Sequence, residues 1–249
     1  MIRNIKLTIE YDGTDFCGWQ IQPNDRTVQQ ELERSLSMLT GETIKTTAAG
    51  RTDSGVHACG QVVNIKTHSK LPLSAFVRGG NSRLPYDVRI VRAEPAADDF
   101  NARYSAVRRH YRYYISTRQR AVGRRYAWYY WNKLDVKRMQ EAAQCILGIR
   151  DFKSFCQKNA AVTHHVCHVY KARWFSLDDF ICFEICANRF LHNMVRSLVG
   201  TMVEIGADKL PVNRMTAILD ARDRSGAGPT APALGLFLVK VDYNLDYDE

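Results

Sequence analysis

The sequence predicts an α+β fold, in which strands and helices are mixed rather than strictly alternating. Runs of alternating apolar and polar residues recur along the 249-residue chain, as in half-buried strands. Apolar residues spaced three and four apart mark several helices between these strands. Two neighbouring strand runs join through a short turn at residues 177–179. Such an antiparallel hairpin, without regular strand–helix alternation, favours α+β over a parallel doubly wound sheet.

The first part of the chain opens with a strand over residues 5–11, where Ile, Leu and Tyr alternate with Lys, Thr and Glu. Thr27 and Gln30 form a capping box that begins a helix, and Gly41 ends it. The segments that follow are predicted as a Thr-rich strand over 42–49, a strand over 61–66, a short helix over 72–84, and strands over 88–93 and 104–117.

A second, similar round of elements begins at Asp135, which caps a helix closed by Gly148. We expect the cleanest boundary at residues 118–126, which gives an N-terminal half, residues 1–118, and a C-terminal half, residues 119–249. The remaining elements are predicted as strands over 168–176 and 180–187, a long apolar-periodic helix over 189–205, a short helix over 212–221 and a closing strand over 234–241.

The charge of the chain indicates a polyanionic partner. The formal net charge is +9, and residues 100–134 contain no Asp or Glu. Aromatic residues are interleaved with arginines there, and guanidinium groups for phosphates with flat rings for bases suit an RNA-binding surface. The alternative is an ordinary solvated basic face. The arginines of this stretch are Arg103, Arg108, Arg109, Arg112, Arg118, Arg120, Arg124 and Arg125.

The cysteines predict no disulfide framework. There are seven of them, without a regular spacing and without a secretory signal, so we expect reduced, mostly buried thiols. A zinc site is one interpretation of the group Cys156, His164, His165, Cys167 and His168, but it lacks a C-x-x-C pair, and packing is favoured. We therefore expect no metal. No apolar run reaches eighteen residues, so we expect no membrane span and a cytoplasmic location.

The candidate catalytic residue is Asp53, at the centre of residues 48–58. Gly50 and Gly55 flank it and allow a tight loop, with predicted strands on both sides. Scaffolds commonly present reactive groups on such loops. Arg51 could pair with Asp53 and keep the carboxylate ionised. The alternative is an ordinary Asp-Ser-Gly turn with a surface ion pair.

An Asp beside an Arg in an RNA-binding chain permits several chemistries, namely nucleophile, general base or metal ligand. Metal-assisted phosphoryl chemistry needs several converging carboxylates, and none lies near Asp53 in the sequence. The zinc deaminase signature, the phosphate-binding glycine loop and the dinucleotide fingerprint are absent. Cofactor-free chemistry on a nucleotide remains. The alternatives are a non-catalytic RNA-binding module and, below it, a zinc-dependent hydrolase.

Six motifs, in order along the chain, resemble the tRNA pseudouridine synthase A family. The sequence Gly50-Arg51-Thr52-Asp53-Ser54-Gly55-Val56-His57-Ala58 resembles the catalytic signature of that family. The other motifs are Tyr11-Asp12-Gly13 with Gly18-Trp19-Gln20, residues 100–106 with Tyr111-Arg112-Tyr113, residues 151–155, residues 190–196 with Gly200, and residues 231–236. Asn101 departs from the pattern, since the family leads us to expect His there.

The resemblance implies isomerisation of uridine to pseudouridine at positions 38 to 40 of the tRNA anticodon stem-loop, with no metal or organic cofactor. It implies that Asp53 is the nucleophile, that Tyr111 stacks on the flipped uracil, and that Arg196 is the buried partner of Asp53. Arg51 is expected to assist Asp53 and to contact a phosphate. The candidate contacts to the tRNA backbone are Arg103, Arg108, Arg109, Arg112, Arg124 and Arg125.

The resemblance also implies the pseudouridine synthase fold. In that fold two similar halves share a central, largely antiparallel sheet with flanking helices, and the active-site cleft lies between the halves. A homodimer is implied as well, with one tRNA contacting both subunits. No membrane partner is expected.

Overall fold

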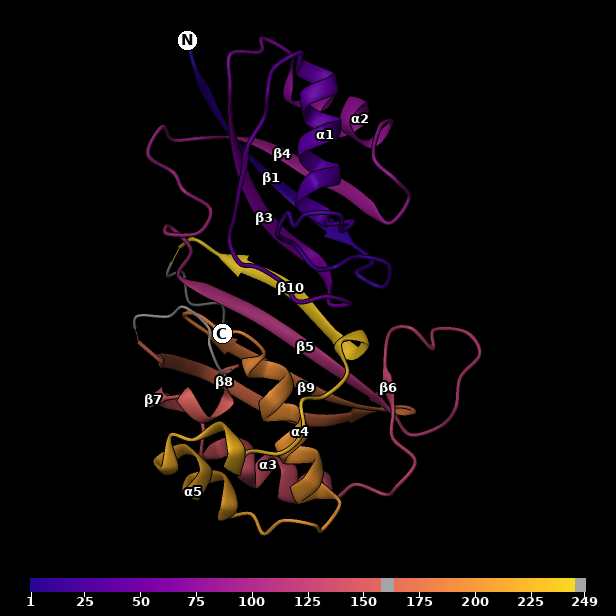
Figure 1. The fold of residues 1–249 in the computed structure, drawn as a ribbon, viewed down its shortest axis with the longest axis vertical. Helices are drawn as coiled ribbons and strands as arrows, with labels where there is room; N and C mark the ends of the chain where they lie inside the picture. Colours follow the sequence, from indigo (N-terminus) through magenta and orange to yellow (C-terminus); the bar gives the residue numbers. More distant parts are fainter. Residues whose placement is uncertain (158–163, 245–249) are drawn as a thin grey trace. The chain divides into compact units, whose positions relative to one another are not determined.

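The computed structural model describes residues 1–157 and 164–244, in two compact units. Unit 1 comprises residues 1–107 together with 238–249, and unit 2 comprises residues 108–237. Each unit combines an antiparallel sheet with helices (Figure 1), so the α+β prediction is confirmed. The sequence predicts an N-terminal half, residues 1–118, that carries the catalytic loop and a C-terminal half, residues 119–249. This division stays a prediction. Among the described residues, no helix has the length and apolar character that crossing a membrane requires.

Unit 1 is built around β1 (Arg3–Tyr11), which pairs antiparallel with β3 (His57–Thr67) and with β4 (Val88–Ala96). Ile5, Leu7 and Ile9 are fully buried, as the predicted alternation requires. The three-residue strand β2 (Thr46–Ala48) also pairs with β3. The last strand, β10 (Leu236–Asp242), lies mostly in unit 1, which includes the chain from residue 238.

Two helices pack together in unit 1, α1 (Val28–Thr40) and α2 (Leu73–Asn81) (Figure 1). The Thr27 hydroxyl accepts a hydrogen bond from the Gln30 amide, and Gly41 ends α1 in the left-handed conformation with φ of 74°. Both predicted helix ends are therefore confirmed. The Ser35 hydroxyl donates to the Gly80 carbonyl at 2.8 Å, which fixes α1 against α2.

Unit 2 contains four antiparallel strands in the order β5 (Arg108–Ser116), β9 (Phe180–Ala187), β8 (Val166–Leu177) and β7 (Gly148–Asp151). The predicted hairpin is confirmed, with its turn at Asp178. The short strand β6 (Trp128–Tyr129) runs parallel to β5. The helices of the unit are α3 (Val136–Gln144), α4 (Met194–Gly206) and α5 (Arg214–Ala221), with 3-10 turns at Lys153–Phe155, Arg224–Gly226 and Ala233–Gly235.

Several predicted boundaries were wrong. The helix predicted to be closed by Gly148 ends at Gln144, and Gly148 instead begins β7. Three other boundaries differ for local reasons. The strand expected over 42–49 is only β2, because the Glu42 carboxylate accepts from the Thr67 hydroxyl at 2.9 Å and the His68 amide at 3.0 Å. The helix expected from residue 189 begins at Met194, because Asn193 adopts a left-handed φ of 62°. The strand expected from residue 104 begins at Arg108, because residues 101–105 form a turn.

Candidate active site

Asp53 lies half-buried in a tight turn between β2 and β3 of unit 1, as predicted. The Val56 amide donates to the Asp53 carbonyl at 3.1 Å, which closes the turn. Gly55 has φ of 78°, a conformation that favours glycine. The turn therefore holds the Asp53 backbone in place, and the residue as a whole is half-buried.

An aromatic loop at residues 16–19 covers one side of the Asp53 turn. The Ser54 hydroxyl and the Gly55 amide both donate to the Phe16 carbonyl, at 3.2 and 3.3 Å. The Trp19 amide donates to the Thr52 carbonyl at 3.0 Å, and the Trp19 side chain is 3% exposed. These bonds join the Gly18-Trp19-Gln20 motif to the Asp53 motif, so the two motifs form one structure.

Two glycines allow this close contact. A Cβ at Gly18, where φ is 86°, would lie 2.7 Å from the Thr52 carbonyl oxygen. A Cβ at Gly13 would lie 2.0 Å from the Val56 carbonyl oxygen. Because real Cβ atoms do not approach backbone oxygens so closely, any side chain at either position would displace the Asp53 turn.

The other side of the turn is fixed by buried polar groups on β1 and β3. The Tyr11 hydroxyl lies 2.9 Å from the Thr52 hydroxyl, and the Gln61 side chain donates to the Gly50 carbonyl at 2.8 Å. Gln61 is fully buried and Tyr11 is 4% exposed. Burial raises the pKa of Tyr11 to about 12, against the smaller lowering by its hydrogen bonds to Thr52 and Gln61. Tyr11 is therefore a neutral phenol that can donate to Thr52 at ordinary pH.

Arg51 differs from its expected arrangement. Its side chain is exposed, and it makes no hydrogen bond or ion pair with any residue that the structure describes. The expected Arg51–Asp53 pair is thus not formed there. An exposed guanidinium beside the turn is nevertheless available to a phosphate group.

Tyr111 and Arg196 lie in unit 2, whereas Asp53 and Arg51 lie in unit 1. Tyr111 is on β5 opposite Ile185, 9% exposed, with its ring edge-to-face against Phe190 at 5.0 Å between centroids. This contact joins the middle motif to the motif that begins at Phe190. Within unit 2, Tyr111 therefore packs against a ring that follows β9, and its role stays a prediction.

Arg196 lies in the first turn of α4 rather than in the middle of a long helix. Its Nε donates to the Ala231 carbonyl at 2.8 Å, and its Nη1 donates to the Asn193 side-chain oxygen at 3.0 Å. The Ala231 amide donates back to the Arg196 carbonyl at 3.1 Å. The half-buried guanidinium therefore has a fixed direction.

The remaining motif residues of unit 2 gather around the same loop. A Cβ at Gly200 would lie 1.8 Å from the Pro229 carbonyl oxygen, so only glycine fits between α4 and this loop. The Tyr113 hydroxyl donates to the Pro232 carbonyl at 2.7 Å, and the Tyr113 side chain is fully buried. Burial raises the pKa of Tyr113, while the charge of Arg196 lowers it by less.

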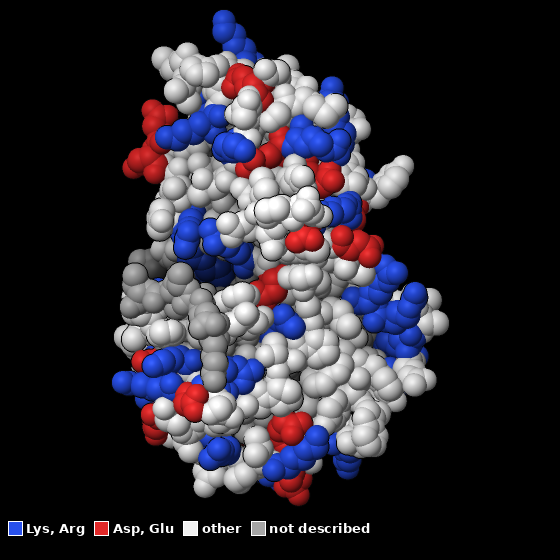
Figure 2. All heavy atoms as spheres, viewed as in Figure 1, with Lys and Arg blue, Asp and Glu red and all other residues white. Residues whose placement is uncertain are grey.

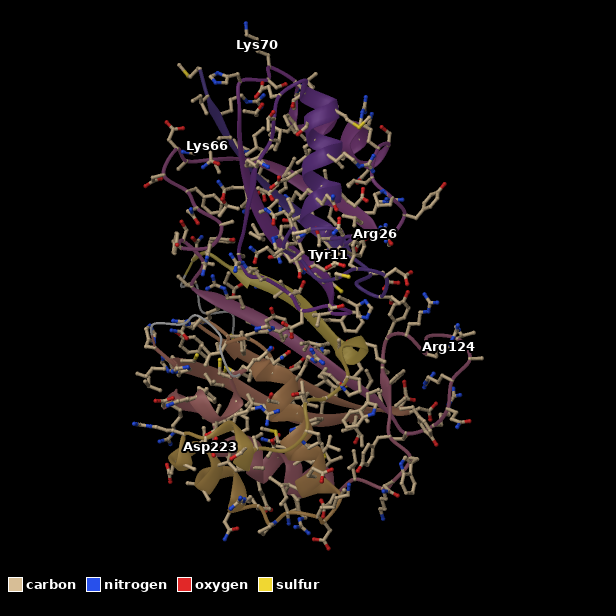
Figure 3. The ribbon with its side chains drawn as sticks, viewed as in Figure 1. Tyr11, Arg26, Lys66, Lys70, Arg124 and Asp223 are labelled. Atoms are coloured by element: carbon tan, nitrogen blue, oxygen red, sulfur yellow. The ribbon has the colours of Figure 1, made fainter. Side chains whose placement is uncertain are left out.

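The candidate backbone-contact arginines differ in their surroundings. Arg103, Arg124 and Arg125 are exposed. Arg109 donates to the Asn188 carbonyl at 2.7 Å, and the Arg108 guanidinium lies over the Tyr170 ring at 4.7 Å. Figure 2 shows Lys and Arg gathered in several groups on the face that it presents, one of them where Figure 3 labels Arg124.

Arg112 forms an ion pair with Glu184, opposite it on β9, and donates to the Tyr114 hydroxyl at 3.2 Å. Its position on the sheet explains this arrangement, since opposite charges facing each other across two strands attract.

In residues 1–157 and 164–244, no group of three or more His, Cys, Asp or Glu side chains could hold a metal ion. Within the candidate cluster, Cys156 and Cys167 are buried, and burial raises the pKa of both thiols. Buried, protonated thiols behave as apolar packing groups.

Comparison with known proteins identifies the family. The family model described as tRNA pseudouridine synthase matches residues 7–105 and 142–244. The chain belongs to the tRNA pseudouridine synthase family. It is 44% identical over 244 residues to the tRNA pseudouridine synthase A of Caldicellulosiruptor bescii, covering 97% of this chain and 100% of that protein.

Two further relatives cover nearly the same length. The tRNA pseudouridine synthase A of Moorella thermoacetica is 44% identical, covering 96% of this chain and 99% of that protein. The Bacillus subtilis protein of that name is 40% identical, with the same coverage. The chain is thus an enzyme of the tRNA pseudouridine synthase family, an isomerase. A crystal structure of the archaeal box H/ACA sRNP Nop10-Cbf5 complex aligns with a TM-score of 0.37 at 8% identity, over 90% of this chain and 60% of that chain, a similarity too low to carry detail.

Sequence reasoning found the motifs of this tRNA pseudouridine synthase family member but missed several supporting residues. Gln61 was not predicted as a site residue, and Tyr113 was named only as part of a motif, although each holds a motif backbone through a side-chain hydrogen bond. Asn101 was noted only as a departure. Its side-chain oxygen accepts from the Arg103 and Tyr104 amides at 3.0 and 3.1 Å, so it caps the turn that presents Arg103. An Asn at the start of a turn often accepts such hydrogen bonds, so the residue type at position 101 could have predicted this cap.

Proposed function

We propose that this enzyme converts uridine to pseudouridine at positions 38, 39 and 40 of the tRNA anticodon stem-loop, with Asp53 as the nucleophile and without a cofactor. The observation that carries the proposal is the fixed Asp53 turn. The turn is hydrogen-bonded to the Phe16 loop on one side and to Gln61 on the other, and Asp53 within it is half-buried. A preorganised nucleophile needs little rearrangement to react.

The chemistry fits a carboxylate acting without a co-reactant. Isomerisation breaks the N1–C1′ bond of uridine, forms a C5–C1′ bond, removes the proton from C5 and places one on N1. Substrate and product contain the same atoms and electrons, so no oxidant or reductant is consumed. An ionised carboxylate can attack C1′ of the ribose or C6 of the uracil, and it can leave again in either case. Both routes remain open.

The other site residues receive roles in the same proposal. A uridine within a stem has to be flipped out before a carboxylate can reach it, at a cost of a few kcal/mol. Tyr111 is proposed to stack on the flipped uracil and to take part in the final proton transfer. Arg196 is proposed to partner the Asp53 carboxylate, and Arg51 to contact a phosphate of the flipped nucleotide. The proposed backbone contacts are Arg103, Arg108, Arg109, Arg112, Arg124 and Arg125.

The setting of the reaction is also proposed from the family. We infer a homodimer in which one tRNA contacts both subunits, and a cytoplasmic location with no membrane partner. Sedimentation of the purified protein with and without tRNA tests the dimer. A monomer in both samples would contradict it.

The decisive test uses purified protein and an unmodified tRNA transcript with uridines at positions 38 to 40, in EDTA. Pseudouridine is mapped by carbodiimide treatment and primer extension. We expect modification by the wild type and none by Asp53→Asn, which should still bind the tRNA. Asp98→Asn, an exposed acid of unit 1, is the matched control and should retain activity.

The same assay separates the alternatives. Binding without modification by the wild type would leave a non-catalytic RNA-binding module as the better account. Loss of wild-type activity in EDTA would contradict the metal-free proposal. Tyr111→Phe should keep the packing against Phe190 and lose turnover, because it keeps the ring and removes the hydroxyl. Arg196→Lys should lose turnover because lysine cannot reproduce both the Ala231 and Asn193 hydrogen bonds.

A further inference from the structure

A small pocket lies in unit 2 where the chain leaves β5 and returns as β6. Its volume is about 250 Å³, and the residues that line it include Ser116, Arg118, Arg120, Arg124 and Tyr129. Figure 3 labels Arg124 on this loop. Pockets for drug-sized ligands begin at about 300 Å³. This one therefore suits a single small group, such as a phosphate, rather than a whole nucleotide.

The loop that forms the pocket is anchored to the β8–β9 hairpin. The Arg118 Nε donates to the Asp179 carboxylate at 2.6 Å, and Arg120 binds the same oxygen at 3.0 Å. The Thr117 amide and hydroxyl both donate to the Asp179 carbonyl at 3.0 Å. The Arg118 guanidinium holds the pKa of Asp179 below its usual value. Asp179 is thus ionised at neutral pH and fixes the loop.

Arg120 is the most firmly placed of the pocket arginines. Its Nε donates to the Ser116 hydroxyl at 3.1 Å, and its guanidinium lies over the Phe180 ring at 4.1 Å. Its side chain is 18% exposed. A guanidinium held in one orientation loses little freedom when it binds an anion, and its planar fork matches phosphate oxygens.

The pocket carries an excess of positive charge. Three guanidinium groups line it, those of Arg118, Arg120 and Arg124, and the Asp179 carboxylate pairs with the first two of them. By contrast, Arg26 has Asp87 and Arg138 has Asp208 as ion-pair partners of their own. Arg124 is exposed, and its Nη1 donates to the Ala121 carbonyl at 3.2 Å. Most of its donors therefore stay available to a ligand.

We propose that this pocket binds one backbone phosphate of the RNA substrate. In this proposal Arg124 and Arg118 contact the phosphate, and Arg120, held in one orientation, lines the pocket beneath it. The substrate identity rests on the proposed function, in which Arg124 is already a backbone contact. The pocket includes none of the residues proposed to act on the flipped uridine. The half-exposed Tyr129 ring at the rim offers a flat surface to the adjoining sugar or base.

The test measures tRNA binding over a series of salt concentrations, with Asp53→Asn as the parent so that turnover does not intervene. The slope of log K against log salt is negative, and each lost phosphate contact reduces its magnitude by about 0.9 for a duplex and about 0.7 for a single strand. We expect Arg124→Gln and Arg118→Gln each to make the slope shallower by about this amount and to weaken binding several-fold. Arg34→Gln, an exposed arginine of α1 paired with Glu31, is the control and should change neither.

A conservative variant distinguishes a built pocket from diffuse charge. Arg124→Lys keeps the charge but loses the guanidinium fork, so we expect weaker binding than the parent and tighter binding than Arg124→Gln. Parent-like binding by Arg124→Lys, or an unchanged slope in Arg124→Gln, would overturn the pocket. Mapping of pseudouridine with Asp53 intact tests the proposed function separately. If the wild type binds tRNA with the full salt slope but forms no pseudouridine, the proposed function is contradicted and the phosphate pocket is not.

Discussion

The Tyr11 hydroxyl and the Thr52 hydroxyl lie 2.9 Å apart in the buried interior of unit 1. Tyr11 is the last residue of β1, and Thr52 directly precedes Asp53. This hydrogen bond therefore connects a core strand to the residue beside the proposed nucleophile. It gives a physical reason for a tyrosine in the Tyr11-Asp12-Gly13 motif, since the ring fills the core while its hydroxyl fixes the loop.

Tyr11→Phe removes this hydroxyl and keeps the ring. We expect a loss of about 1 kcal/mol in the free energy of unfolding, the usual size of one hydrogen bond, and a fall in turnover because the Asp53 turn is less well fixed. Urea denaturation and the pseudouridine assay measure the two effects. Tyr86→Phe, at a 97% exposed tyrosine of the same unit, is the control. Unchanged turnover in Tyr11→Phe would contradict the positioning role.

Alkaline pH provides an independent check on the buried Tyr11 phenol. Burial raises its folded-state pKa from 10 to about 12. Between these values the unfolded chain loses the proton while the folded chain keeps it, so the free energy of unfolding falls as pH rises, by up to about 1.4 kcal/mol per pH unit. Tyr11→Phe lacks this contribution. We therefore expect it to be less stable than wild type at pH 8 and to approach or exceed wild type near pH 11.5. Parallel stability curves for the two proteins would contradict the shift.

The sequence predicted a helix or strand boundary correctly where one or two residues at that boundary determine it. Thr27 and Gly41 delimit α1 because capping needs only a side-chain acceptor at one end and a left-handed residue at the other. The left-handed conformation of Asn193 was not predictable in this way. It removes the first turn from the expected helix and places Arg196 near the start of α4, where the guanidinium can reach Ala231.

The catalytic residue of the candidate site was predictable from the sequence, but the hydrogen bonds that hold the site in place were not. Asp53 was found because its motif is contiguous. The Tyr113–Pro232 hydrogen bond joins residues 119 positions apart, and the Gln61–Gly50 bond depends on the register of β3 against the turn. No short-range pattern encodes either contact. The absent Arg51–Asp53 pair shows the converse, because residues two apart in a turn can point in different directions.

Asn101, where the family led us to expect His, acts as a turn cap. Its side-chain oxygen accepts from the Arg103 and Tyr104 amides, and the Ser105 amide donates to its carbonyl at 2.9 Å. Asn101→Ala should lower the free energy of unfolding by about 1 kcal/mol, as for a lost helix cap. Asn101→Asp supplies the same acceptor and should restore most of it. Urea denaturation of the three proteins checks this, and equal stability of the Ala and Asn forms would rule out the cap.

The fit between the aromatic loop and the Asp53 turn can be separated from backbone strain with two glycines. Gly18 and Gly41 have φ of 86° and 74°, so alanine is strained by a similar amount at both. A Cβ at Gly41 meets nothing within 4 Å, whereas at Gly18 it lies 2.7 Å from the Thr52 carbonyl oxygen and 3.2 Å from the Asp53 carbonyl carbon.

Both Gly→Ala variants should therefore lose about 1 kcal/mol of stability through strain alone, which urea denaturation measures. Gly18→Ala should lose more, because the Asp53 turn must also move away from the new methyl group. Turnover should fall sharply in Gly18→Ala, since displacing a catalytic group by about 1 Å can cost on the order of 100-fold, and it should stay near wild type in Gly41→Ala. Equal turnover in the two variants would mean that the position of the Asp53 turn does not depend on residues 16–19. The hydrogen bonds from Ser54 and Gly55 to Phe16 would then be packing contacts without a part in catalysis.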